Sequence, residues 1–445
     1  MGNQSSLIMV GYTFSGALPV DRKYEVGMKQ VKEYLTIAMA YVGVIVGAGL
    51  SSGQDLLQYF LAFGRQGIIG IVLLIGLNVI FGKIVITLGS YFQSRSHSEV
   101  LQAIASPLAS RIIDWTLIIS SFVVGFVMIA GAGSNLEQQF GLPSWLGALI
   151  CAGLIVMVTF LDFNKITKIL GIFTPIVIVM MIIMTIVSII QKPLDLYTLD
   201  QAAESLQAPM PNVWLSGVNY FSLCLMTGVS MGFILGGSIP SIRSAEKGGI
   251  WGGALVGLLI ACAYLCLMLN ASRAVHSDMP MLEIASGISP LFSLIYALVI
   301  FSLIFNTAFS LFYGLASRFA KGDERKMRIY MIGLVAGGYL LSFGGFSSLI
   351  AMVYPVLGYM GFVLIAILAL AWVRGRQKII KEKKTRAKLF RLAAAEADGK
   401  LSLQEKKTFK QLCIQSAAGT RRIEQAVRNY ARQALQPSNP DSVLS

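Results

Sequence analysis

An apolar stretch of this chain is interrupted by ten residues that carry glycine, hydroxyl, amide and carboxylate groups. They read VGAGLSSGQD and occupy positions 46–55. A glycine inside a helix costs about 1 kcal/mol relative to alanine, and a carboxylate in a membrane helix costs about 3 kcal/mol unless it faces protein or water. The pattern therefore predicts a broken helix whose free N–H and C=O groups meet an ion or a polar solute. Close packing of small residues against a neighbouring helix is the alternative interpretation.

A second cluster of glycines and hydroxyls lies about 180 residues downstream. It reads TGVSMG at positions 227–232 and is followed by Gly236-Gly237-Ser238. We expect a second broken helix here, facing the first. The candidate solute-binding residues of the two clusters are Gly47, Ala48, Gly49, Ser51, Ser52, Gln54, Asp55, Thr227, Gly228, Ser230 and Gly232.

The elements that must position these residues are long apolar runs. Of 445 residues 55% are hydrophobic and only 13% are charged, which argues against a soluble enzyme. Two histidines, His97 and His276, and five scattered cysteines leave little material for a metal or hydrolase site, so we expect no enzyme. A bilayer core of about 30 Å needs roughly 20 apolar residues per helix. Ten runs meet this need, at 34–62, 67–92, 112–136, 144–161, 169–190, 213–239, 249–270, 289–317, 328–343 and 348–372.

Basic residues are distributed unevenly along the chain. The net charge is +14, yet residues 1–373 carry 19 basic and 16 acidic residues, whereas residues 374–445 carry 17 and 6. With the N-terminus inside, 32 basic residues fall on the inner side and three on the outer. This predicts a multi-pass protein of the cell membrane with both termini cytoplasmic. The basic tail predicts contact with anionic lipid headgroups, so nucleic-acid binding is not needed to explain the charge.

The ten runs divide into two halves of five. The third run begins 177 residues before the eighth, and the fifth begins 179 residues before the tenth. Each half would start on the opposite side of the membrane, so the halves form an inverted repeat, an arrangement typical of transporters. The predicted parts are a cytoplasmic N-terminal segment (1–33), a first repeat (34–190), an external connector (191–212), a second repeat (213–372) and a basic helical cytoplasmic tail (373–445). In the tail, Ser402 and Glu405 predict a capping box that opens a helix.

Two motifs resemble the bacterial YkvI membrane-protein family. The residues 47–55 are similar to that family's Gly-Ala-Gly-Phe-Ala-Ser-Gly-Gln-Glu signature, with Asp55 in place of the glutamate. The second motif is Ala130-Gly131-Ala132-Gly133, continuing through Glu137 to Phe140-Gly141-Leu142-Pro143. The resemblance covers about residues 34–372. The ten-helix plan with broken helices 1 and 6 also resembles the leucine-transporter fold of the amino acid/polyamine/organocation superfamily, which implies an all-α integral membrane protein.

The leucine-transporter resemblance implies an ion site as well. That fold reads Gly-x-x-Val-Gly-x-Gly at the break of helix 1, and Gly43, Val46, Gly47 and Gly49 match it. It implies that the carbonyls of Gly43 and Val46 face a sodium ion and that the N–H groups of Ala48 and Gly49 face a substrate carboxylate. The ion site would be completed from helix 8 by Leu303, Asn306 and Thr307. Asn306 stands where the fold has a hydroxyl, and it could instead bond helix to helix.

A proton is the alternative coupling ion. Asp55 and Glu137 are the candidate carriers, but Asp55 could also pair with a substrate amine or bond across to helix 6, and Glu137 could be a charge at the external mouth. Lys165 and Lys168 lie at the cytoplasmic start of helix 5, where membrane anchoring explains them.

Together these features predict a secondary active transporter of a small polar or zwitterionic solute, an amino acid or related amine, coupled to a sodium or proton gradient. No cofactor is expected beyond the coupling ion. The alternative function is a membrane ligand sensor with the same fold and no transport. The sequence indicates neither the solute nor the oligomeric state.

Overall fold

A computed structural model describes residues 34–45, 48–160, 172–193, 195–397 and 401–435. These residues form helices and connecting segments, and no strand occurs among them. The elements are the helix Tyr34–Ile45, α2 (Ala48–Ser52), α3 (Gln54–Tyr59), η2 (Leu61–Gln66), α4 (Gly67–Phe92), α5 (His97–Ile104), α6 (Pro107–Phe140), α7 (Ser144–Val158), α9 (Phe173–Gln191), α10 (Leu196–Glu204), α11 (Val213–Gly237), α12 (Ile242–Leu269), α13 (Ala271–Ala274), α14 (Pro280–Ser286), α15 (Pro290–Ala320), α16 (Glu324–Leu341), η3 (Ser342–Gly344), α17 (Phe346–Ala397), α18 (Leu403–Gln415) and α19 (Thr420–Leu435).

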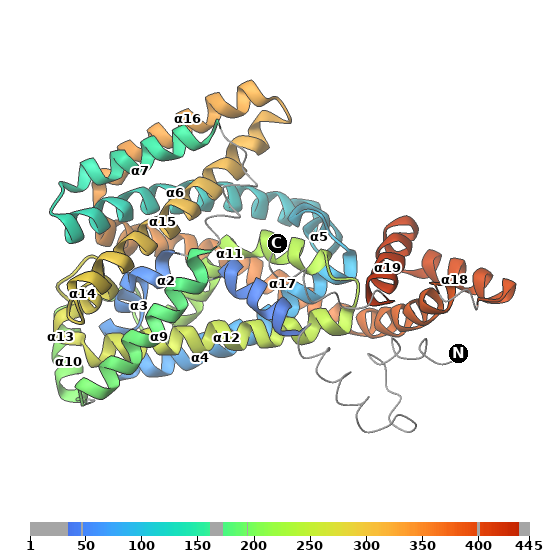
Figure 1. The fold of residues 1–445 in the computed structure, drawn as a ribbon, viewed down its shortest axis with the longest axis horizontal. Coiled ribbons are helices and arrows are strands. Elements are labelled where there is room, and N and C mark those ends of the chain that lie inside the picture. Colours follow the sequence, from blue (N-terminus) through green and yellow to red (C-terminus); the bar gives the residue numbers. More distant parts are fainter. Residues whose placement is uncertain (1–33, 46–47, 161–171, 194, 398–400, 436–445) are drawn as a thin grey trace.

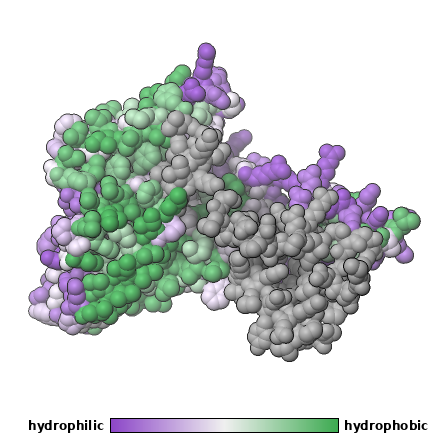
Figure 2. Space-filling view, in the orientation of Figure 1, coloured by the Kyte–Doolittle hydropathy of each residue, from purple (hydrophilic) through white to green (hydrophobic). Residues whose placement is uncertain are grey.

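Eight of these helices are long and apolar enough to cross a membrane: α4, α6, α9, α11, α12, α15, α16 and α17. The shorter apolar helices Tyr34–Ile45 and α7 occupy the first and fourth predicted runs. Hydrophobic side chains cover much of the bundle surface, and hydrophilic ones gather at its ends and on the tail (Figure 2). The all-α, multi-pass membrane class predicted from the sequence is confirmed, and the described helices fit the ten predicted runs.

The long helices form two groups that pack side by side. One group brings α4 against α11 and α12, and the other brings α6 against α7 and α15, with α16 beside α15. The pairs α4 with α12 and α6 with α15 join helices that hold the same place in the two predicted halves. Figure 1 shows α10, α13 and α14 at one end of the bundle, here named the loop end, and α18 and α19 at the opposite end, named the tail end.

The glycines of α11 serve helix packing, which differs from the sequence prediction. We expected a break at 227–232, but α11 runs as one helix from Val213 to Gly237. A Cβ at Gly232 would meet the side chain of Val85, and one at Gly236 would meet the backbone of Ile86, both on α4. The small residues therefore let α11 approach α4 closely. The favourable packing compensates for the low helix propensity of glycine.

The basic tail is a helical module with a core of its own. Helix α17 continues unbroken from the last apolar run to Ala397, and α18 and α19 follow. The predicted capping box of Ser402 and Glu405 opens α18. Seven buried residues form the tail core: Leu389, Ala393, Phe409, Cys413, Ala418, Ile423 and Val427.

Candidate functional site

The first membrane segment is broken into short helices. The helix Tyr34–Ile45 is followed by α2 and α3, and Gly53 between the latter two has a left-handed backbone with φ of 80°. A side chain at Gly53 would be strained and would also meet Met281, so glycine is required there. Val46 and Gly47, two predicted site residues, lie outside the described residues. The interruption expected within residues 46–55 is thus present, and α3 beyond it is buried along its whole length.

The carboxylate of Asp55 is buried at this break. Asp55 is 4% exposed, and the hydroxyl of Tyr220 on α11 donates a hydrogen bond of 3.2 Å to its Oδ2 atom. Its Oδ1 atom is buried and has no hydrogen-bond partner among the described residues. A Cβ at Gly49 would collide with the Asp55 carboxylate, so the carboxylate lies directly over the backbone of α2. The break therefore holds a buried carboxyl group with one oxygen that has no partner among the described residues.

Aromatic side chains enclose the same region. The rings of Tyr59 and Tyr220 are 5.2 Å apart between centroids, and the hydroxyl of Tyr296 on α15 donates a 2.9 Å hydrogen bond to the carbonyl of Ser51. Tyr59, Tyr220 and Tyr296 were not among the predicted site residues. Tyrosines in apolar runs are typical of helix packing, so the sequence carries no signal that separates these three from the others.

The hydroxyl and amide groups of the first cluster are partly used within the protein. Ser52 donates a 2.9 Å hydrogen bond to the carbonyl of Gly49, and Ser51 is fully buried. The Gln54 amide donates a 2.9 Å hydrogen bond to the Ser347 hydroxyl on α17, while its Oε1 atom is buried without a partner among the described residues.

Only part of the second cluster faces the first segment. A Cβ at Gly228 would meet the side chain of Ile45, which places Gly228 against the helix Tyr34–Ile45. Thr227 is exposed and donates to the Cys224 carbonyl within α11, and Ser230 is half-buried. Gly232 packs on α4, as described above, and thus belongs to helix packing.

Four of the predicted ion ligands lie on two helices, with Gly43 on the helix Tyr34–Ile45 and Leu303, Asn306 and Thr307 on α15. The Thr307 hydroxyl donates to the Leu303 carbonyl at 2.8 Å. The Oδ1 atom of Asn306 is buried and unpartnered among the described residues, and Gly43 is exposed.

A polar network closes the site toward the loop end. Asp278, in the segment before α14, accepts hydrogen bonds from Ser134 on α6 and from Ser347 on α17. Gln54 and Gln58 of α3 both donate to Ser347. Gln54, predicted as a solute ligand, is therefore part of the layer that ties α3, α6 and α17 together. Glu137, the other predicted proton carrier, is exposed on α6.

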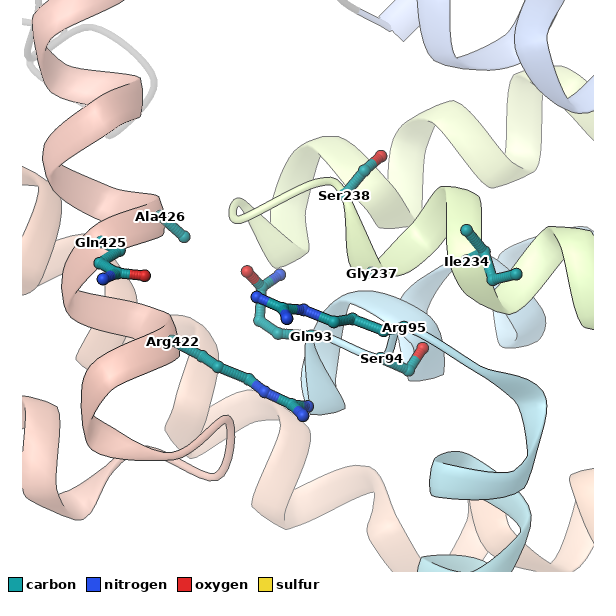
Figure 3. A pocket seen from close by; sticks show the side chains of 9 residues that line it. All are labelled: Gln93, Ser94, Arg95, Ile234, Gly237, Ser238, Arg422, Gln425 and Ala426. Carbon is teal, nitrogen blue, oxygen red and sulfur yellow. The ribbon is translucent and has the colours of Figure 1, made fainter. Parts of the chain in front are cut away.

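The tail end carries a cavity of about 390 Å³ between α19 and the ends of α4 and α11 (Figure 3). Its lining includes Gln93 and Arg95 after α4, Ser238 after α11, and Arg422 and Gln425 of α19. None of the predicted solute or ion residues lines it.

Two arginines attach the tail to the ends of the membrane helices and to α5. Arg386 of α17 is fully buried and donates to the carbonyls of Ser90 and Tyr91, at 2.7 Å each, and of Pro240 at 3.0 Å. Arg422 makes two hydrogen bonds with Glu99 of α5, at 2.9 and 3.0 Å, and its guanidinium holds the pKa of Glu99 below the usual range. Neither contact could be predicted from the sequence, since both join residues about 300 positions apart.

Comparisons with known proteins agree with the motif resemblance. The chain is 26% identical over 335 residues to the uncharacterized membrane protein YkvI of Bacillus subtilis, covering 75% of this chain and 94% of YkvI. It is also 26% identical over 330 residues to the uncharacterized protein YyaD of the same organism, covering 74% of this chain and 94% of YyaD. The chain is thus similar to both proteins over nearly their whole length. No family model matches it.

Two solved structures are similar to the chain at low sequence identity. The chain is similar to the crystal structure of MhsT in complex with L-phenylalanine, with a TM-score of 0.49 and 14% identity over 90% of this chain and 98% of that chain. It is similar to the inward-facing conformation of Mhp1, with a TM-score of 0.48 and 13% identity over 92% of this chain and 95% of that chain.

Proposed function

We propose that this protein is a secondary active transporter of a small polar or zwitterionic solute, an amino acid or related amine. The observation that carries the proposal is the Asp55 carboxylate, which is buried at a helix break with one oxygen unpartnered among the described residues. A buried carboxylate in a membrane helix is costly unless a cation or donor meets it, and intramembrane carboxylates commonly mark solute or ion pathways. A solute ammonium supplies the missing partner.

In this proposal the backbone of the break binds the other end of the solute. The N–H groups of Ala48 and Gly49 would hold a carboxylate, because free amides at a helix start attract anions. Gly47, Ser51, Ser52 and Gln54 would line the same space. Thr227, Gly228 and Ser230 remain the proposed contribution of α11, with Gly228 the best supported because it contacts the first segment.

A structural role for Asp55 is the competing account. The Tyr220 hydrogen bond supports it, because it joins the break to α11 as a purely structural carboxylate would. The two accounts differ in the role of Oδ1: a structural carboxylate would gain nothing from a solute amine, whereas a binding carboxylate would.

Sodium is the proposed coupling ion, held by Gly43, Val46, Leu303, Asn306 and Thr307. The unpartnered Oδ1 atom of Asn306 supports this set, since a buried amide oxygen without a donor is free to meet a cation. Neutral oxygens suit a monovalent hard cation better than a divalent one, which binds carboxylates. Coupling to a proton through Asp55 is the alternative.

The tail end is proposed to face the cytoplasm, which places both termini there. The distribution of basic residues supports this orientation, as does the concentration of cations on the tail. Attachment of a membrane-impermeant reagent to single cysteines tests it in intact cells: residue 195 should react from outside, and residue 321 should not. The reverse pattern would contradict the orientation.

Uptake into proteoliposomes tests the function. We expect a panel of amino acids and amines to contain a solute that raises the melting temperature of the purified protein, since binding stabilises the folded state by mass action. That solute should then accumulate inside vesicles when a sodium gradient is imposed, and Glu204→Gln, at an exposed carboxylate of α10 at the loop end, should transport normally. Accumulation driven only by a pH gradient would replace sodium with a proton. Binding without accumulation under either gradient would favour the sensor.

A further inference from the structure

A second cavity lies at the tail end, away from the helix break and from the cavity of Figure 3. It measures about 450 Å³ and is formed by the end of α4, by α5, by the first turn of α6 and by α17. Its lining is mostly apolar, but Arg374 and Lys378 of α17 also face it, and no carboxylate does. The cavity therefore combines an apolar floor with a positive wall.

The two cations are available to a ligand. Arg374 and Lys378 are exposed, and neither makes an ion pair or hydrogen bond with another described residue. They are four positions apart on a continuous helix, so their side chains leave the same face. The start of α6, capped by Ser106, also lines the cavity and adds the positive end of a helix dipole.

The cavity lies where the apolar run of α17 gives way to basic residues. On α17 the apolar run ends at residue 372, so Leu370 lies within it and Arg374 lies just beyond it. Large apolar side chains next to the cavity are exposed on both walls: Leu370 and Val373 of α17 are 52% and 73% exposed, and Leu108 of α6 is 70% exposed. Exposed apolar side chains that lie next to one another indicate a surface that a partner covers, and lipid is such a partner.

We propose that this cavity binds one anionic phospholipid, with the phosphate at Arg374 and Lys378 and an acyl chain along the apolar floor. Basic pockets between membrane helices on the cytoplasmic side bind anionic headgroups, and each nearby Lys or Arg contributes about 1 kcal/mol. A free phosphate would leave the apolar floor unfilled, so the lipid is the better match. The site is separate from the proposed solute site and does not depend on transport.

Native mass spectrometry of the full-length protein in detergent tests the site. Phosphatidylglycerol is the probe, and phosphatidylcholine of the same acyl chains is the neutral comparison. Arg374→Gln/Lys378→Gln removes the two cations of the cavity, and Lys384→Gln/Lys388→Gln removes two exposed cations of the same helix that do not line it. We expect the first phosphatidylglycerol to bind the cavity variant roughly 30-fold more weakly and the control variant as tightly as the parent.

A variant that fills the cavity without changing its charge distinguishes lipid binding in the cavity from diffuse electrostatic attraction. Ala109→Trp fills the space and keeps both cations, so it should also weaken the first phosphatidylglycerol, while inorganic phosphate should not displace that lipid. Equal losses in the two double variants, or no preference for phosphatidylglycerol over phosphatidylcholine, would overturn the proposal. Displacement by inorganic phosphate would show a free-anion site instead. The double variants change exposed residues only, so the test stands even where Ala109→Trp does not fold.

Discussion

The hydroxyl of Tyr220 donates a 3.2 Å hydrogen bond to Oδ2 of Asp55 and so joins the broken first segment to the continuous helix α11. One oxygen of a buried carboxylate is thereby fixed in place, and the other points to no donor among the described residues. A buried carboxyl group that is held at one oxygen and unpartnered at the other is suited to receive a cationic group from outside the protein.

Removing the Tyr220 hydroxyl should loosen this arrangement. In Tyr220→Phe the Oδ2 atom loses its donor, which costs about 1–3 kcal/mol for a buried polar group. We expect a lower melting temperature without solute and a smaller deficit when saturating solute is present. Tyr330→Phe, at an exposed position of α16, is the control and should leave both values unchanged. A Tyr220→Phe protein as stable as the parent would show that the hydrogen bond contributes nothing.

A methyl group at Gly49 should block the site. Its Cβ would collide with the Asp55 carboxylate, and overpacking of this kind costs about 1–3 kcal/mol, or about 5- to 150-fold in affinity. Gly76→Ala on α4 is the matched control, because no atom lies within 4 Å of the added Cβ. Solute affinity measured by isothermal titration should fall in Gly49→Ala and stay within twofold in Gly76→Ala. Equal affinities in the two variants would place the solute elsewhere.

The extent to which the sequence predicts this site depends on how unusual each residue is in its surroundings. Glycines, serines and a carboxylate within an apolar run have few explanations other than a break, and residues 46–55 were identified for that reason. The glycines of α11 have a second explanation, close packing on α4, and the structure supports that one at Gly232 and Gly236. Tyr220 could not be identified, since its role depends on a contact across 165 positions.

Sodium dependence should weaken when Thr307 loses its hydroxyl. Removing one of about five neutral oxygens should reduce sodium affinity about tenfold, the loss of one ligand worth about 1.4 kcal/mol. Thr159→Ala is the control, because Thr159 is buried and makes the same 2.8 Å bond to the carbonyl four residues earlier. The measurement is the sodium concentration that gives half-maximal uptake. An unchanged value in Thr307→Ala would remove Thr307 from the ion site.

The tail should detach when Arg386 is replaced. Arg386→Met keeps the bulk of the side chain but leaves the carbonyls of Ser90, Tyr91 and Pro240 without their donor and Glu382 without its cation. Breaking a buried pair from one side costs about 3–5 kcal/mol. Limited proteolysis should then cleave the segment between α17 and α18 at least tenfold faster than in the parent. Lys384→Met, at an exposed neighbouring position, should be cleaved at the parent rate. Equal rates in all three proteins would show that Arg386 does not hold the tail in place.

The contact between Arg422 and Glu99 adds a pH dependence to tail docking. Because the folded-state pKa of Glu99 lies below its ordinary value of 4.5, its contribution is present above pH 4.5 and is lost as the pH falls through the lower folded value. The pair is exposed, so the effect should be small. The same proteolysis assay should show a modest rise in cleavage at acid pH in the parent and none in Glu99→Gln.

The most direct test of the central claim compares two ligands on two proteins. The affinities of an aminated solute and of its deaminated analogue of the same shape are measured for the parent and for Asp55→Asn. If Asp55 binds the solute amine, the substitution should weaken the aminated ligand by at least tenfold, because only that ligand loses a charge-assisted hydrogen bond worth about 1.5–3 kcal/mol. The analogue should bind both proteins within a factor of about two. Equal losses for both ligands, with a folded Asp55→Asn protein, would contradict the claim and leave Asp55 a structural residue.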